Sequence, residues 1–316
     1  MESLSVPSGS HFRSPRRSHD EASVLIDGHV HVFRPAAISP RTVDDLAPAH
    51  RDAPVEDLLT VMKTNRVDAA VLVPLDEHDD YVKAVLRVRP QAFAAVAVAD
   101  AAVQGRTGEA SVAALRRRRI DFGFHALRTQ WLGTPGRPIR DSPFFPVLSL
   151  LAEEGLHLWA YLTPDQLPLV DALARELPSL TIVLNHLGFC PRDMRVDTHG
   201  RPVFDNPFPS TTRIGVVRLS QRPNVCVKFS GQYALSRQPP PYHDLDHVVH
   251  EIADSFGASR MLWASDYPWT REVPGYSALL ALCRQTFPNA SAGEIADIQG
   301  GTALRLFPHL QSVEDN

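Results

Sequence analysis

The sequence predicts an α/β protein folded as one (β/α)8 (TIM) barrel. Along most of the 316 residues, short apolar segments typical of strands alternate with amphipathic segments typical of helices. From residue 23 onward this alternation supplies eight strands and eight helices, the number that such a barrel requires. Polar residues also stand where the expected strands end, which is where barrel active sites are built. The alternative is a doubly wound open sheet, but no Gly-x-Gly-x-x-Gly follows any expected strand.

The expected strands are short runs rich in Val, Ile, Leu and Ala, as in a parallel sheet that is covered by helices. Turn-forming or polar residues bound most of these runs, which sets their ends. In chain order the expected strands are Val24–Val32, Ala69–Leu75, Ala92–Ala99, Phe122–Arg128, Leu156–Leu162, Thr181–Leu187, Val225–Ser230 and Met261–Ser265.

The expected helices carry apolar residues at spacings of three and four, which places them on one face. The first helix, Val55–Asn65, aligns Val55, Leu58, Leu59 and Met62 in this way. A final helix, about Ala292–Leu306, is expected to close the chain. The remaining expected helices are Tyr81–Val88, Ala110–Arg119, Phe145–Glu154, Leu167–Glu176, Thr212–Ser220, Leu245–Phe256 and Tyr276–Thr286.

The chain is expected to form one domain, residues 23–310, behind a disordered leader, residues 1–22. The leader is rich in Ser, Arg, Pro and His and lacks the apolar stretch of a signal peptide. No internal repeat or linker marks a second domain. Long loops follow four of the strands and are expected at the C-terminal mouth of the barrel. These loops are Arg34–Pro54, Gly133–Pro143, Phe189–Ser210 and Tyr233–His243.

Composition argues against nucleic acid and membrane as partners. The formal net charge is −4, which gives no electrostatic argument for binding nucleic acid or an anionic membrane. No apolar run approaches the ~20 residues that span a bilayer. The three cysteines, Cys190, Cys226 and Cys283, are widely spaced and predict reduced thiols rather than a disulfide framework. We therefore expect a cytoplasmic protein that acts on a small molecule.

The most informative motif is His29-Val30-His31 at the end of the first strand. Residues two apart in a strand point to the same side, so Asp27, His29 and His31 are expected to share one face. Two neighbouring imidazoles at a strand end can hold a metal ion or polarise a substrate oxygen. By itself the motif is equally consistent with two partly exposed loop histidines.

The fourth and fifth strands add candidates for substrate contact. His125 and Arg128 have opposite parity and both reach the mouth only if the fourth strand bends. An arginine there suits a substrate carboxylate, and a salt bridge at the rim is the equally plausible alternative. On the fifth strand Trp159 and Tyr161 are expected to line a pocket. His157, earlier on that strand, fits a core histidine better.

The last three strands each end in one residue with chemical potential. His186 ends the sixth strand, and Lys228 lies in the apolar seventh, where an unpaired ammonium is costly. Asp266 ends the eighth and can act as a general base or metal ligand, with Tyr267 beside it as a substrate contact. Strands one and eight are neighbours in a closed barrel, so Asp266 is expected close to the histidine pair.

These segments resemble the amidohydrolase superfamily, within it the amidohydrolase-related group of pyrone-dicarboxylate lactonases, sugar lactonases and aminocarboxymuconate-semialdehyde-type decarboxylases. The resemblance spans about residues 23 to 307 and implies a barrel with its site at the strand C-termini and Asp266 as the proton-transfer group. Its segments are Ile26-Asp27-Gly28-His29-Val30-His31, Leu184-Asn185-His186-Leu187-Gly188, Val227-Lys228-Phe229-Ser230-Gly231 and Trp263-Ala264-Ser265-Asp266-Tyr267-Pro268.

The resemblance leaves the cofactor open between one divalent metal (Zn or Mn) and none. Metal-dependent decarboxylases of the group carry a histidine at the end of strand five, where this chain has Trp159-Ala160-Tyr161-Leu162. His29, His31 and Asp266 remain as ligands, one short of a closed four-coordinate site. The pattern is therefore more similar to the lactonases, in which a metal is dispensable when histidines and arginines polarise the lactone carbonyl.

The favoured hypothesis is hydrolysis of a small cyclic ester, a lactone, that is carboxylated or hydroxylated. Asp266 would activate water, while His29, His31 and His186 polarise the carbonyl directly or through an ion. The alternatives are a metal-dependent decarboxylase, C–C lyase or hydratase, and a non-hydrolytic tailoring enzyme or binding protein on the same scaffold. The sequence leaves a homo-oligomer open. Substrate contacts are expected from His125, Arg128, Trp159, Tyr161, Lys228 and Tyr267.

Overall fold

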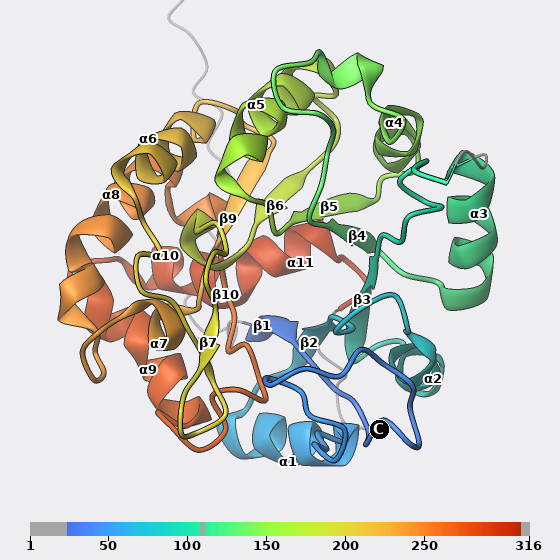
Figure 1. Cartoon of the computed structure of the whole chain (residues 1–316). Helices are drawn as coiled ribbons and strands as arrows, with labels where there is room; N and C mark the ends of the chain where they lie inside the picture. The colour runs from blue at the N-terminus through green and yellow to red at the C-terminus, as the bar shows by residue number, and fades with distance from the viewer. Residues whose placement is uncertain (1–23, 108–110, 311–316) are drawn as a thin grey trace, which may run out of the picture.

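Eight parallel strands follow one another around a barrel, and the helices lie outside them (Figure 1). The computed structural model describes residues 24–107 and 111–310, so the expected leader lies outside the described residues. The predicted (β/α)8 barrel is confirmed. In sheet order the strands are β1 (Ile26–Val30), β2 (Ala69–Leu72), β3 (Phe93–Val98), β4 (Ala126–Thr129), β5 (His157–Ala160), β6 (Ile182–Leu184), β9 (Val225–Phe229) and β10 (Met261–Trp263).

The seam between the first and last strands closes the barrel at its C-terminal mouth. The backbone N–H of Asp266 donates to the carbonyl of His29 at 3.1 Å, and the N–H of His31 donates to the carbonyl of Tyr267 at 2.7 Å. Gly28 permits this approach, because a Cβ there would lie 2.9 Å from the carbonyl oxygen of Trp263. The seam therefore brings the histidine pair and Asp266 together through the backbone.

Helices cover the outside of the barrel and bury the apolar faces that their spacing predicts. The outer helices are α1 (Val55–Asn65), α2 (Asp80–Val88), α3 (Ser111–Phe122), α4 (Phe145–Glu153), α5 (Leu167–Glu176), α6 (Ser210–Leu219), α8 (Asp246–Phe256) and α9 (Tyr276–Thr286). The chain ends in α10 (Ala292–Ala296), a π-helical turn over Asp297–Gly301 and α11 (Thr302–Leu306), where the sequence predicts one helix.

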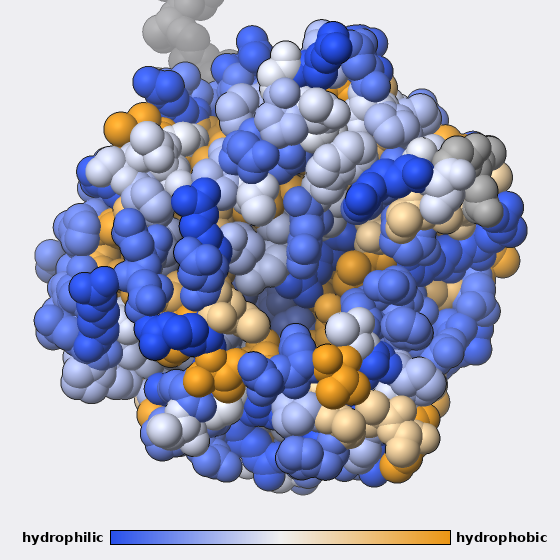
Figure 2. Space-filling model, viewed as in Figure 1, coloured by the Kyte–Doolittle hydropathy of each residue, from blue (hydrophilic) through white to orange (hydrophobic). Residues whose placement is uncertain are grey.

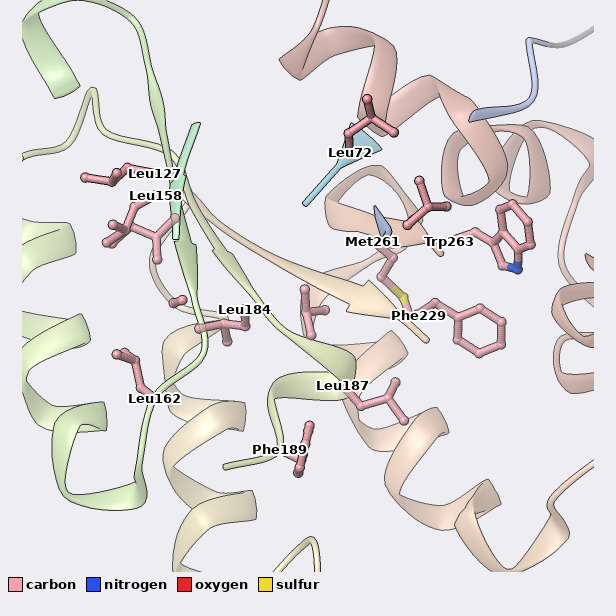
Figure 3. Close-up of a cluster of buried hydrophobic side chains, with 14 of the residues drawn as sticks. Leu72, Leu127, Leu158, Leu162, Leu184, Leu187, Phe189, Phe229, Met261 and Trp263 are labelled. Carbon is pink, nitrogen blue, oxygen red and sulfur yellow. The ribbon is translucent and has the colours of Figure 1, made fainter. Parts of the chain in front are cut away.

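Alternate residues of each strand serve two separate cores. Leu127, Leu158 and Leu184, on neighbouring strands, belong to the large core between sheet and helices (Figure 3). Inside the barrel a smaller core of Val96, Ala126 and other residues packs on Phe307, which follows α11. Both cores consist of apolar side chains, so the strands can carry polar side chains only near their C-terminal ends or where partners satisfy them.

Two predicted loops contain short elements of their own. A two-stranded antiparallel hairpin, β7 (Arg195–Val196) with β8 (Pro202–Val203), lies between β6 and α6. A one-turn helix, α7 (Gln232–Leu235), follows β9. None of the helices in residues 24–107 and 111–310 has the length and hydropathy that crossing a bilayer requires. The three cysteines are buried free thiols.

The prediction that His125 reaches the mouth is wrong, because β4 begins only at Ala126 and Phe122 ends α3. His125 lies at the opposite, N-terminal end of the barrel. Its Nδ1 accepts a hydrogen bond from the backbone N–H of Ala95 at 3.2 Å. Its ring stacks on His309 with 4.2 Å between centroids. Burial, then the nearby His309, lowers the pKa of His125 to about 4.

This depressed pKa predicts an acid-sensitive contribution to stability. His125 in the folded chain binds its proton more weakly than in the unfolded chain, whose histidine pKa is about 6.5. Protonation below pH 6.5 therefore favours unfolding, increasingly so toward pH 4. His125→Asn keeps an acceptor for Ala95 but does not titrate. The free energy of unfolding, measured with urea, should fall between pH 7 and pH 5 in both proteins. We expect this fall to be about 1–2 kcal/mol smaller in the variant than in the wild type. Equal losses in both proteins would contradict this assignment.

Candidate active site

Four side chains predicted at three strand ends converge at the mouth. Asp266 Oδ1 lies 3.5 Å from His31 Nε2 and 3.8 Å from His29 Nε2. Asp266 Oδ2 lies 3.5 Å from His186 Nε2. All four residues are buried. A carboxylate thus stands at the centre of three imidazoles that come from β1 and from the turn after β6.

Unusual backbone geometry places two of these residues. Asp266 has φ 59° and His186 has φ 34°, in the left-handed region that non-glycine residues rarely adopt. Such strain persists only where the surroundings hold it, and it clusters at functional sites. At both positions the chain leaves a strand and turns sharply. The turn directs the side chain across the mouth instead of along the strand's alternation.

The charge state of Asp266 is set by its neighbours. Burial raises the pKa of the carboxyl, but His186, His31 and the Tyr233 hydroxyl together outweigh burial and hold it below its usual range. The Tyr233 hydroxyl donates to Oδ2 at 2.6 Å. Oδ1 is buried without a hydrogen-bond partner within the described chain. The carboxylate is therefore ionised at neutral pH, with one oxygen available to accept a proton.

Hydrogen bonds assign the protons of the histidine pair. His31 Nδ1 lies 2.7 Å from the carbonyl oxygen of Val73, which can only accept, so the proton of His31 is on Nδ1. The two Nε2 atoms lie 3.2 Å apart, a contact that fits a hydrogen bond when the proton of His29 is on Nε2. His29 Nδ1 is left as an acceptor, and Trp159 Nε1, at 3.4 Å, is a donor that faces it.

Lys228 also supports His29 from below. Its Nζ lies 2.6 Å from His29 Nδ1 and 2.5 Å from Asn185 Oδ1. Burial, and then the nearby Arg128, lower the pKa of Lys228 well below its usual value. Even a neutral amine has the two N–H bonds that these acceptors need. The predicted functional lysine therefore acts on His29, within the barrel and beneath the mouth.

These bonds bear on the metal question. His29 Nε2, His31 Nε2 and Asp266 Oδ1 lie within 4.8 Å of one another, close enough to hold a divalent ion. A histidine ligand normally donates its other N–H to an acceptor, as His31 does to Val73. His29 instead faces the donors Lys228 and Trp159 and presents N–H to the site. His31 and Asp266 fit an ion, and the hydrogen bonds of His29 do not.

Lys228→Met is expected to lower kcat about 10- to 100-fold and to leave KM within about threefold, because Lys228 orients His29 and does not line the cavity. Methionine retains most of the buried volume, and thermal unfolding reports on folding. Steady-state kinetics on a hydrolysed lactone separate the two constants. A raised KM at unchanged kcat would instead indicate that Lys228 contacts substrate.

A cavity opens above Asp266. In Figure 2 the cavity is seen as a hollow near the centre of the displayed face. The cavity lies at the C-terminal ends of the strands, where the sequence predicts the mouth of the barrel. Its lining residues are Leu46, Arg128, Tyr161, His186, Phe189, Met194, Pro202, Phe204, Gly231, Tyr233, Ala234, Leu235, Asp266 and Trp269.

The six residues expected to contact substrate lie at different depths in the barrel. Arg128 and Tyr161 line the cavity, with the guanidinium carbon 4.7 Å from the centre of the Tyr161 ring. Trp159, Lys228 and Tyr267 are fully buried and are absent from its lining. Trp159 and Lys228 lie one layer deeper in the barrel, and His125 lies at the far end. Parity alone could not distinguish these depths.

Asp27 departs from the predicted face. The pairing of β1 with β2 shifts register between Asp27 and Val30, which breaks the alternation. The Asp27 carboxylate accepts from the Tyr276 hydroxyl of α9 at 2.6 Å and from the backbone N–H of Ser265 at 2.9 Å. It therefore ties the seam to an outer helix while His29 and His31 face Asp266.

Sequence reasoning missed several site residues. Tyr233, which donates to Asp266, lies in a segment predicted as a loop. Ser230 Oγ lies 2.8 Å from His186 Nδ1 and orients that ring. Ser230 directly follows β9, so its place at a strand end was the available signal. Phe189 and Phe204 enter the cavity from the hairpin segment, and no motif marks them.

Comparisons with known proteins agree with this geometry. A family model described as Amidohydrolase matches residues 26–309. The L-fucono-1,5-lactonase of Burkholderia ambifaria is 27% identical over 294 residues, covering 89% of this chain and 94% of that protein.

Two crystal structures show the same fold. One, from Pseudomonas putida, is assigned as a 2-pyrone-4,6-dicarboxylic acid hydrolase. It has TM-score 0.69 and 22% identity, and covers 92% of this chain and 100% of that one. The other is an amidohydrolase from Burkholderia multivorans with bound zinc, with TM-score 0.69 and 21% identity. It covers 90% of this chain and 99% of that one.

Proposed function

The chain belongs to the amidohydrolase family, and from that premise we propose that it hydrolyses a small lactone in the cavity above Asp266. The observation that carries the proposal is the ionised Asp266 carboxylate in the lining of a cavity that also contains Arg128, a cation without an ion pair among residues 24–107 and 111–310. The lactonase relative and the pyrone-dicarboxylic acid hydrolase support the choice of a cyclic ester.

In this mechanism the Asp266 carboxylate accepts a proton from water while the water oxygen attacks the lactone carbonyl. The bond between the carbonyl carbon and the ring oxygen then breaks, and Asp266 returns the proton to the leaving alkoxide. The product is an open-chain hydroxy acid. The low pKa of Asp266 makes it a weak base, so its position must supply much of the rate enhancement.

His186 is the imidazole best placed to stabilise the oxyanion, because it lines the cavity beside Asp266. Burial lowers the pKa of His186 to about 4, so it acts as a neutral hydrogen-bond donor. His29 and His31 lie outside the cavity lining, within 4 Å of Asp266 Oδ1. Arg128 and Tyr161 bind a carboxylate or hydroxyl of the substrate.

The site works without a metal in this proposal, because Trp159 and Lys228 face His29 Nδ1 as donors and so favour its proton on Nε2, the nitrogen that an ion would need. We expect purified enzyme to keep its lactone activity within about twofold after dialysis against a chelator. Metal analysis of the same samples provides the control for removal. The competing proposal, one Zn or Mn ion on His29, His31 and Asp266, draws on the zinc-bound neighbour. Activity that is lost on chelation and restored by either ion would establish it.

The function itself is tested with a panel of five- and six-membered lactones and aromatic carboxylates. Lactone opening releases acid, which a pH-stat records, whereas decarboxylation releases carbon dioxide. We expect acid release from at least one lactone and no carbon dioxide from any aromatic acid. Carbon dioxide release without lactone opening would instead indicate the decarboxylase alternative.

A further inference from the structure

We infer that the substrate is a lactone with one carboxylate and an apolar, unsaturated body that is poor in hydroxyl groups. The inference rests on the proposed function and narrows its substrate class. It also assigns recognition of the body to residues 189–204, the segment between β6 and α6 that contains the β7–β8 hairpin.

We infer a single carboxylate on the substrate because Arg128 is the one Lys or Arg side chain that lines the cavity. Its guanidinium lies against the Tyr161 ring, and no ion pair joins it to a carboxylate in residues 24–107 and 111–310. Asp266 is the one carboxylate in the lining, and it belongs to the catalytic group. A substrate carboxylate is the partner that this guanidinium lacks, and the planar fork suits it.

The shortage of hydroxyl groups follows from the other polar side chains of the lining. Tyr233 is bonded to Asp266, and His186 is bonded to Ser230. Among the lining residues there is no Asn, Gln, Ser, Thr or Glu to bond sugar hydroxyls. The Tyr161 hydroxyl is the main neutral group left. A polyhydroxylated lactone would leave several hydroxyls buried without side-chain partners, which is costly.

We infer an apolar substrate body from the hydrophobic part of the cavity lining. Phe189, Met194, Pro202 and Phe204 line the cavity, and all four lie in residues 189–204. The rings of Phe189 and Phe204 meet edge to face with 4.8 Å between centroids. Phe189 also lies 5.9 Å from the Tyr161 ring. Aromatic surfaces of this kind prefer a flat, apolar or unsaturated ring.

The test compares matched lactones on the full-length enzyme. The three substrates are an unsaturated five-membered lactone with a carboxymethyl arm, its methyl ester, and L-fucono-1,5-lactone. We expect kcat/KM for the acid to exceed both others by about 100-fold or more. In Arg128→Met the kcat/KM for the acid should exceed that for the ester only about threefold. Arg128→Lys should retain part of the wild-type preference for the acid. Phe204→Asn should reduce the ratio of kcat/KM for the acid to kcat/KM for the sugar lactone.

Inhibition of the wild-type enzyme provides a second test that does not depend on the folding of any variant. Benzoate should inhibit the wild-type enzyme competitively, at a concentration at least tenfold below that needed for benzamide. Equal inhibition, or a sugar lactone as the best substrate, would overturn the substrate class and leave lactone hydrolysis intact. Failure of the wild type to open any lactone would overturn both this inference and the proposed function.

Discussion

Asp266→Asn should lower kcat for lactone opening by about 10²- to 10⁴-fold, the range expected for loss of a general base. The amide has the same shape, and its oxygen can still accept from Tyr233. It cannot take the proton of the attacking water. Initial rates measured by acid release, with thermal unfolding as a check on folding, test the expectation. Activity retained within a few-fold would exclude Asp266 as the base.

Tyr233→Phe is the matched control for that experiment. It removes the hydrogen bond to Oδ2 but leaves the carboxylate in place. Because that bond helps to lower the pKa of Asp266, its loss should raise this pKa and make the carboxylate a stronger base, so the rate should stay within about tenfold of the wild type. A Tyr233→Phe defect as deep as that of Asp266→Asn would mean that the phenol takes part in proton transfer itself.

Gly231→Ala is expected to lower kcat by about 100-fold through displacement of His186. A Cβ at Gly231 would lie 2.7 Å from the Cβ of His186 and 2.9 Å from its Cγ. Neither atom is at the end of a flexible chain, so the imidazole must move. Near a reacting centre, a shift of about 1 Å is enough for a 10²-fold loss.

Gly136→Ala provides the control. Gly136 has φ 78° and Gly231 has φ 82°, so alanine meets similar backbone strain at both positions. Nothing lies within 4 Å of a Cβ at Gly136. Both variants should lose stability in thermal unfolding, but only Gly231→Ala should lose activity. Equal activity losses would show that the defect comes from backbone strain rather than from His186.

The alternation of strands and helices was predictable because it depends on local patterns. Val55–Asn65 and Tyr276–Thr286 begin and end as the apolar spacing predicts. The closeness of Asp266 to the histidine pair was also predictable, since a closed barrel makes the first and last strands neighbours. These inferences need only the element order and the chemistry of strand ends.

Strand parity failed where the backbone leaves regular geometry. A register shift in β1 separates Asp27 from His29, although the two were expected to share one face. Parity also assumes that the strand limits are known. β4 begins at Ala126, so His125 precedes the strand and lies at the wrong end. A pattern of alternating residues carries no information about such irregularities.

The sequence by itself determined the barrel, the mouth as the site, and His29, His31, His186 and Asp266 as its candidates. Tertiary structure alone decided depth: Arg128 and Tyr161 face the cavity, whereas Lys228 and Trp159 support His29 from beneath. It also decided the apolar wall, which residues 189–204 fold across the mouth. The physical reason is that strand order follows from local patterns, whereas depth and loop path depend on packing between segments distant in the chain.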